Sequence, residues 1–123
     1  MEFDALSNRV IGCAIEVHRL LGPGLLESAY EQCLAYELGL AGIGFKLQHA
    51  LPVKYKGLRL DCGYRVDVLV QDALILELKS VNSILGVHQS QLITYMKLAG
   101  IKTGLLINFN VSQLKSGIKR LVF

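Results

Sequence analysis

The spacing of apolar residues separates a helical first third of the chain from a strand-rich remainder. Over residues 6–21 and 25–40, apolar side chains recur every three or four positions, which is the pattern of helices that bury one side. Gly22, Pro23 and Gly24 lie between these segments. Because glycine accepts a left-handed cap and proline cannot continue a helix, the pattern predicts two helices joined by a short turn.

From residue 46 to residue 80 apolar residues alternate with polar ones, which is the period of strands. We expect one strand over 46–56 with a bend or edge at Pro52, and a long strand over 58–70 that is weakened or bulged near Gly63. A third strand is expected over 74–80, after a tight turn. These three strands provide the first half of a sheet.

The last part of the chain predicts a helix followed by two strands. Residues 86–99 are expected to form the helix, with Gln91 and Tyr95 four positions apart on one side. Residues 103–109 are strongly apolar, as in a central or parallel strand, and residues 118–122 form a last strand. The order predicts a single α/β domain over residues 1–123, a mixed sheet flanked by helices.

Composition and charge narrow the function classes. The chain is 52% hydrophobic and 19% charged, yet no run approaches the roughly 18 apolar residues of a membrane span, so we expect no membrane partner. The net charge of +3 is too weak to identify a nucleic-acid binder. Basic residues do gather at Lys46, Lys54, Lys56, Arg59 and Arg65. They suit either a stripe for phosphates or ordinary solvated strand edges.

Cysteine usage and the N-terminus bear on the compartment. The 3 cysteines include no C-x-x-C pair, which indicates reduced packing residues rather than a metal or redox site. The first residues lack the basic and apolar regions of a signal peptide. We therefore expect a cytoplasmic protein.

The turn around Asp72 decides which charged side chains face each other. If the loop has three residues, Asp67 lies directly opposite Glu77 and Arg65 lies opposite Lys79. A two-residue loop would instead move Glu77 to the other face of the sheet. The three-residue register is the one we predict, and it brings two carboxylates together.

Two facing carboxylates suit a divalent cation. Two negative charges repel each other, and burial adds several kcal/mol to the free energy needed to keep both side chains charged. A cation between them removes this cost. Mg²⁺ or Mn²⁺ prefers oxygen ligands and retains water, so Asp67 and Glu77 with a backbone carbonyl are a sufficient protein contribution. Lys79, on the same face, would reach a metal-bound water or a phosphate. The alternative is a cross-strand salt-bridge cluster that includes Arg65.

These residues resemble a known family. Asp67 with Glu77-Leu78-Lys79 is similar to the D…(D/E)-x-K core of the PD-(D/E)xK nuclease superfamily, which has a restriction-endonuclease-like fold. The segment Gly24–Tyr30 resembles the signature of the GxxExxY proteins, a small bacterial branch of that superfamily. Three further runs are similar to this branch or to exonuclease-like members: Ile15–Gly24, Gln91–Tyr95 and Gly104–Asn110.

The resemblance implies roles for individual residues. Asp67, Glu77 and Lys79 would be catalytic, metal would be held by Glu27, Asp67 and Glu77, and substrate would be positioned by Gln91 and Tyr95. The residue before Asp67 is Val66 rather than the proline of the superfamily name. Elsewhere, packing is the favoured role for Tyr30 and a structural role for His18, while His88 is a weaker candidate for substrate contact.

Two functions follow from this interpretation. The first is a metal-dependent nuclease that uses Mg²⁺ or Mn²⁺ to hydrolyse phosphodiester bonds, with DNA as its partner. The second is a non-catalytic module that keeps the nuclease fold and binds nucleic acid or a protein. Homodimerisation is expected to supply contact area that a chain of 123 residues lacks.

Overall fold

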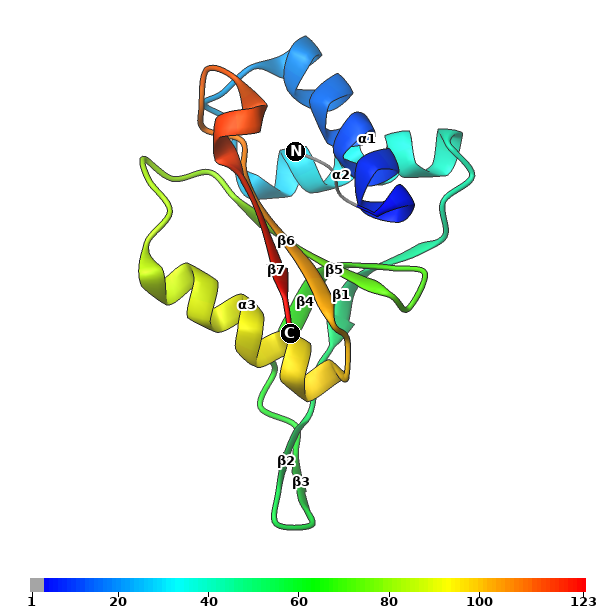
Figure 1. Ribbon diagram of the computed structural model, residues 1–123, viewed down its shortest axis with the longest axis vertical. Coiled ribbons are helices and arrows are strands. Elements are labelled where there is room, and N and C mark those ends of the chain that lie inside the picture. The colour runs from blue at the N-terminus through cyan, green and yellow to red at the C-terminus, as the bar shows by residue number, and fades with distance from the viewer. Residues whose placement is uncertain (1–3) are drawn as a thin grey trace.

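The fold is a mixed sheet with two helices on one face and one on the other. A computed structural model describes residues 4–123 (Figure 1). Helices α1 (Ala5–Leu21) and α2 (Glu27–Leu40) pack together on one face, and α3 (Gly86–Ala99) covers the other. The predicted α/β architecture with flanking helices is confirmed.

Five strands form the main sheet: β1 (Phe45–Ala50), β4 (Arg65–Val70), β5 (Leu74–Lys79), β6 (Thr103–Asn108) and β7 (Ile118–Val122). Their order is β1-β4-β5-β6-β7. Only β5 and β6 run parallel, because α3 crosses over between them, and every other neighbouring pair is antiparallel. The apolar strand β6 is therefore internal and partly parallel, as its sequence predicts. A short 3₁₀ helix, η1 (Leu114–Gly117), precedes β7.

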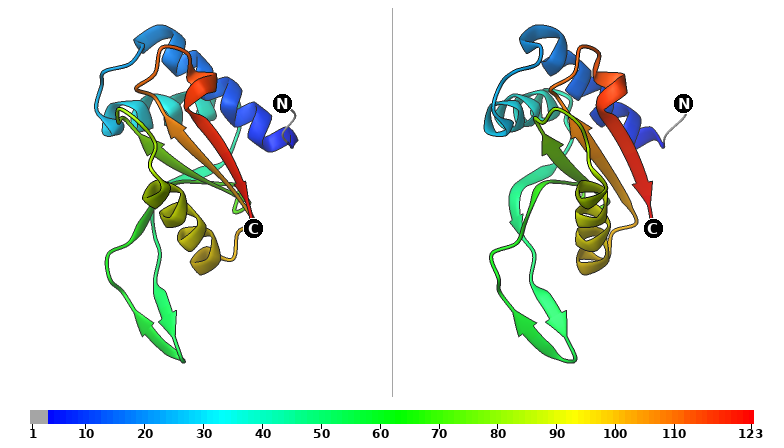
Figure 2. Two further views of the ribbon diagram at one scale, coloured as in Figure 1. Left: turned by 60° about the vertical axis from the view of Figure 1, so that its left-hand side comes forward. Right: turned by 90° about the vertical axis from the view of Figure 1, so that its left-hand side faces the viewer.

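The expectation of one long strand over 58–70 is wrong. The chain forms β3 (Leu58–Leu60), leaves the extended ladder over 61–64 and then begins β4. Gly63 has φ +80°, a conformation that strands do not adopt. On the other side Pro52 separates β1 from β2 (Val53–Tyr55). Strands β2 and β3 make a separate hairpin that projects from the body beyond α3 (Figures 1 and 2).

Two apolar clusters hold the layers together. One joins α1 and α2 to the sheet and includes Tyr30, Leu76 and Phe109, and the other joins α3 to the opposite face. Val66 packs in the α3 cluster, although alternation along β4 would place it with Val68. This change of side coincides with Asp67, so the strand turns at that residue. In the part of the chain described, no helix is long and apolar enough to cross a membrane.

Tyr30 connects α2 to the turn that precedes it. The side chain is fully buried and stacks on Phe109 with ring centroids 4.4 Å apart, which confirms its packing role. Its hydroxyl donates to Gly22 O at 2.6 Å and accepts from Leu25 N at 3.1 Å. The turn between α1 and α2 is thus fixed by one phenol group.

Tyr30→Phe is expected to lower the free energy of unfolding by about 1–3 kcal/mol, because the buried side chain loses two partly buried hydrogen bonds while the ring stays. Urea denaturation followed by circular dichroism measures this change. Tyr36→Phe is the matched control, since Tyr36 on the same helix is exposed and should be neutral. Equal stability of the two variants would contradict the assignment of the Tyr30 hydroxyl.

Candidate active site

The β4–β5 turn sets the register of the candidate site. Gln71 and Asp72 both have φ +50°, and Ala73 N donates to Val70 O at 2.9 Å. This turn leaves Val70 paired with Leu74 across a three-residue loop, as predicted. Two further ladder pairs, Leu69–Ile75 and Val68–Leu76, keep the same register. Asp67 is therefore brought beside Glu77.

Beyond Val68 and Leu76 the two strands separate, and side chains replace the ladder. Leu78 N donates to Asp67 Oδ2 at 2.8 Å, and Asp67 N donates to Glu77 Oε1 at 3.4 Å. Each acidic side chain accepts a hydrogen bond from the backbone of the opposite strand. The expected direct ladder pair of Asp67 and Glu77 is thus absent, and the carboxylates themselves bridge the strands.

Glu77 is a buried carboxyl group with an unfavourable charge. Its residue is 5% exposed, and its pKa is raised from 4.5 to about 8, with burial as the largest cause. The negative charges of Asp67 and Glu27 contribute to this increase, whereas the Asp67 N–H and the charge of Lys79 oppose it. The charges of Lys79, Glu27 and Asp67 therefore all influence the ionisation of the Glu77 carboxyl group.

Neither carboxylate is neutralised by an ion pair. Within residues 4–123, no Lys, Arg or His nitrogen lies within ion-pair distance of Asp67 or Glu77. The alternative of a salt-bridge cluster with Arg65 is not what the side chains form, because Arg65 donates to Gln48 O at 3.1 Å instead. Asp67 therefore has no cationic partner among these residues, and the raised pKa of Glu77 favours its protonated form as long as no cation is bound.

Helix α3 brings Gln91 and Tyr95 towards the same carboxylates. Gln91 Nε2 donates to Tyr95 Oη at 3.0 Å, as their four-residue spacing predicts. Burial raises the pKa of Tyr95, and the charges of Glu77 and Asp67 raise it further, whereas the hydrogen bond from Gln91 lowers it. The phenol group therefore remains a neutral hydrogen-bond donor, and the negative charges of Glu77 and Asp67 are close enough to act on it.

Helix α2 contributes two glutamates, of which the sequence pattern identified only one. Glu27 Oε2 accepts from Ser80 N at 3.2 Å, one residue after Lys79. Glu31, one turn further along, is buried, and burial raises its pKa. Its position four residues after Glu27 was the available signal, because residues four apart share a side of a helix.

Gln48 is the second residue that sequence reasoning missed. It lies on β1 opposite Asp67, and its Nε2 donates to Glu31 Oε1 at 2.6 Å and to Asp67 Oδ1 at 3.4 Å. Its backbone has φ +49°, which is uncommon for a residue other than glycine and interrupts the ladder between β1 and β4. No sequence pattern indicates a positive φ at this position.

The donor set fits a divalent cation only in part. Among residues 4–123, no three His, Cys, Asp or Glu side chains are close enough to form a ready-made metal site. Two carboxylates, one of them buried without a cation beside it, are present at Asp67 and Glu77. Such a pair suits Mg²⁺, which keeps several water ligands and binds through one or two carboxylates. Glu27 is bonded to the backbone at Ser80 instead.

The chain after Lys79 is fixed by Asn108 at the end of β6. Val81 N donates to Asn108 Oδ1 at 3.1 Å, and Asn108 Nδ2 donates to Val81 O at 3.0 Å. Asn108 is also the register partner of Lys79 in the parallel pair β5–β6. The buried amide thereby fixes the segment that carries Lys79 and Ser80.

The remaining candidates have structural partners. His18 Nε2 lies 2.8 Å from Val111 O, which supports its structural role. His88 Nδ1 accepts from Leu85 N at 3.0 Å at the start of α3, so this nitrogen is engaged within the chain. Cys13 and Cys33 are partly buried and Cys62 is exposed, and all three are free thiols.

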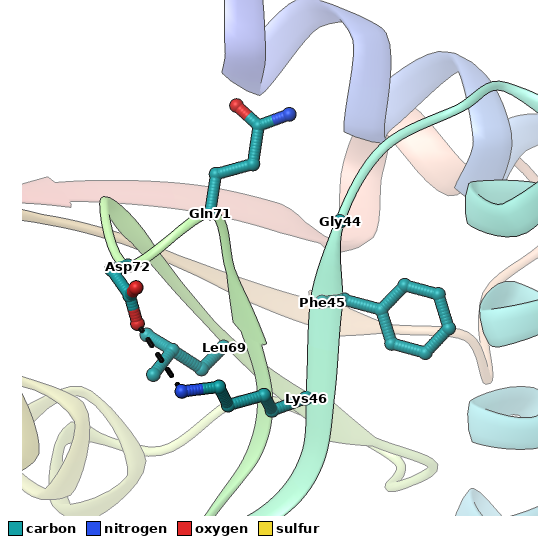
Figure 3. A pocket seen from close by; sticks show the side chains of 6 residues that line it. All are labelled: Gly44, Phe45, Lys46, Leu69, Gln71 and Asp72. Atoms are coloured by element: carbon teal, nitrogen blue, oxygen red, sulfur yellow. Dashed lines mark ion pairs between the residues drawn. The ribbon is translucent and has the colours of Figure 1, made fainter.

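A separate pocket lies at the far end of β4, beside the turn (Figure 3). It has a volume of about 210 Å³ and is lined by Gly44, Phe45, Lys46, Leu69, Gln71 and Asp72. Lys46 Nζ lies 3.8 Å from Asp72 Oδ1, so the positive and the negative side chain that line the pocket form an ion pair. This pocket lacks the unpaired carboxylates of the Asp67 end and is not the candidate site.

Comparison with known proteins identifies the family of the chain. A sequence profile described as the PD-(D/E)XK nuclease superfamily matches residues 4–121. No curated protein and no solved structure matches the chain. The matched range includes every residue of the candidate site.

Proposed function

The chain belongs to the PD-(D/E)XK nuclease superfamily, and from this premise we propose that it is a divalent-metal-dependent nuclease that hydrolyses phosphodiester bonds of DNA. The observation that carries the proposal is the pair of carboxylates at the split between β4 and β5, with Glu77 buried and no cationic side chain in ion-pair contact among the described residues. A buried charge of this kind is destabilising without a counter-ion. It is suited to binding one.

The proposal assigns the metal to Asp67 and Glu77, with Glu27 approaching from α2. Nucleases of this superfamily generally use divalent metals, and Mg²⁺ or Mn²⁺ matches the oxygen donors present. When bound, such an ion lowers the pKa of a water ligand and offsets charge on the scissile phosphate. The ion's absence would leave a site that is acidic and repels phosphate.

The other residues act on water and substrate in this proposal. Lys79 supplies an ammonium group that orients the attacking water and stabilises the developing negative charge. Tyr95 keeps its proton, because burial and the adjacent carboxylates raise its pKa, so its hydroxyl can donate to a phosphate oxygen. Gln91, bonded to that hydroxyl, sets its direction. These three side chains come from β5 and α3.

Metal removal tests the proposal. Purified protein is incubated with duplex, single-stranded and branched DNA and with RNA, in Mg²⁺, in Mn²⁺ and in EDTA. We expect DNA cleavage with either metal and none in EDTA, restored by adding excess Mg²⁺. Lack of cleavage of every substrate with both metals would contradict it. Nucleic-acid binding without cleavage would then assign the chain as a non-catalytic module of the same fold.

A further inference from the structure

The β2–β3 hairpin is an arm that packs on little of its own chain. It forms a separate two-stranded sheet and extends away from the helices and the main sheet in all three views (Figures 1 and 2). Contacts of β2 and β3 are mainly with each other. An isolated two-stranded hairpin is only marginally stable in water. An external partner would therefore stabilise it.

The two sides of the arm differ in chemistry. Lys54 is paired with Arg59 across the strands, so both side chains lie on one side, and Lys56 is at the tip. The other side carries Tyr55 and Leu58, which are 59% and 56% exposed. Residues 53–60 contain these three basic side chains and no acidic one, and Asp61, which follows β3, lies with its Oδ1 3.5 Å from Arg59 Nε, so the arm keeps a net positive charge. The arm is a narrow, positively charged ribbon.

The arm begins at the candidate site. β1, which carries Gln48, leads into it, and β4, which carries Asp67, leads out of it. Gly57 at the tip and Asp67 are ten positions apart, a span of at most roughly 33–36 Å for an extended chain. One helical turn of B-form DNA has about this length. A duplex with its scissile bond at Asp67 would thus lie within reach of the tip.

Resting on the proposed nuclease function, we propose that the β2–β3 arm binds the backbone of duplex DNA within one helical turn of the cleaved bond. The major groove admits a two-stranded ribbon, and Lys54, Lys56 and Arg59 match the charge of its flanking phosphates. A second copy of this chain is the less favourable partner, because two identical arms with three positive charges each would repel one another.

Binding at several salt concentrations tests this proposal. The variant Lys54→Ala, Lys56→Ala, Arg59→Ala is compared with its parent, both carrying Lys79→Met to prevent cleavage, on a labelled duplex of about three helical turns. We expect roughly 10- to 100-fold weaker binding and a salt dependence lowered by about 2–3 in slope, since three phosphate contacts are lost. The matched control is Lys102→Ala, Lys115→Ala, Lys119→Ala, which removes three exposed basic side chains elsewhere.

Equal duplex affinity in the arm variant and its parent would overturn the arm proposal, as would an equal loss in the control. A dimer that Tyr55→Ser, Leu58→Ser disrupts in sedimentation, with duplex affinity unchanged in the basic variant, would assign the arm to a second copy. The nuclease proposal has a separate test. If the wild-type protein binds duplex DNA through the arm but never cleaves it, the nuclease function is contradicted while the arm is still assigned to duplex binding.

A different observation carries a second inference, about Gln48. We infer that Gln48 is a positioning residue, which holds the Asp67 carboxylate in the direction needed for metal binding. One amide group donates to both Glu31 and Asp67, so it fixes the distance between α2 and β4. The positive φ of Gln48 costs energy that an exposed strand residue ordinarily avoids. Residues that orient metal ligands typically change affinity 10- to 100-fold when replaced.

Gln48→Asn tests this role, because asparagine tolerates positive φ but is one methylene too short to span both carboxylates. Calorimetric titration of the protein alone with Mn²⁺ is expected to show about 10- to 100-fold weaker binding, with the melting temperature close to that of wild type. Gln71→Asn is the matched control, since Gln71 is exposed, has φ +50° and lies at the far end of β4. Mn²⁺ binding equal to wild type in Gln48→Asn overturns this inference alone, whereas no binding by wild type overturns it together with the proposed function.

Discussion

Lys79→Met is expected to reduce the rate of DNA cleavage by at least ~100-fold without lowering the melting temperature. Loss of one group that stabilises transition-state charge typically costs about 10²–10³ in rate. Lys79 is half-buried, forms no ion pair with the described residues and influences Glu77 only through its charge. Removing it therefore changes chemistry more than folding. The rate is measured in single-turnover cleavage with saturating Mg²⁺.

A control and a second variant make this result specific. Lys102→Met removes an exposed lysine outside the site and should cleave like the wild type. Asp67→Asn keeps the shape of the side chain and should also abolish cleavage, accompanied by weaker metal binding. Lys79→Met should leave metal binding near normal. Cleavage by Lys79→Met at the wild-type rate would remove Lys79 from the proposed mechanism.

The free energy of unfolding of the metal-free protein is expected to fall as the pH rises from 5 to 8, and deprotonation of Glu77 accounts for the largest part of this loss. The pKa of Glu77 is about 8 in the folded chain and 4.5 when unperturbed, so between these values the folded state binds the extra proton. Stability falls with rising pH wherever the folded state binds more protons than the unfolded state. Integrated over the interval, the loss is roughly 3–5 kcal/mol. The raised pKa of Glu31 acts in the same direction.

Glu77→Gln should remove most of this dependence, because a neutral amide of the same shape loses no proton. Urea denaturation in EDTA at pH 5, 6.5 and 8 measures the slope for wild type and variant. Glu37→Gln, on the partly buried α2 residue Glu37, is the control and should keep the wild-type slope. Mg²⁺ at pH 8 should restabilise the wild type and have less effect on Glu77→Gln. A wild-type stability that is constant or rises over this range would contradict the buried, repelled state of Glu77.

Much of the site could be predicted from local pattern. The turn residues at 71–73 set the register, and the register places Asp67 beside Glu77. Gln91 and Tyr95 bond to each other because both lie on one side of a helix. The strand break at 61–64 could not be placed in this way, since Gly63 signalled a weak point and not a separate hairpin.

The sequence by itself determined the three helices, the succession of strands in the second half of the chain, the β4–β5 register and the pair of carboxylates, because periodicity and turn chemistry act over a few residues. Only the tertiary structure decided that Glu77 is buried, that the strands part at Asp67, and that Glu31 and Gln48 join the site from α2 and β1. These features arise where segments distant in the chain meet. Burial and the field of neighbouring charges, which set the pKa of Glu77, exist only once those segments are packed together.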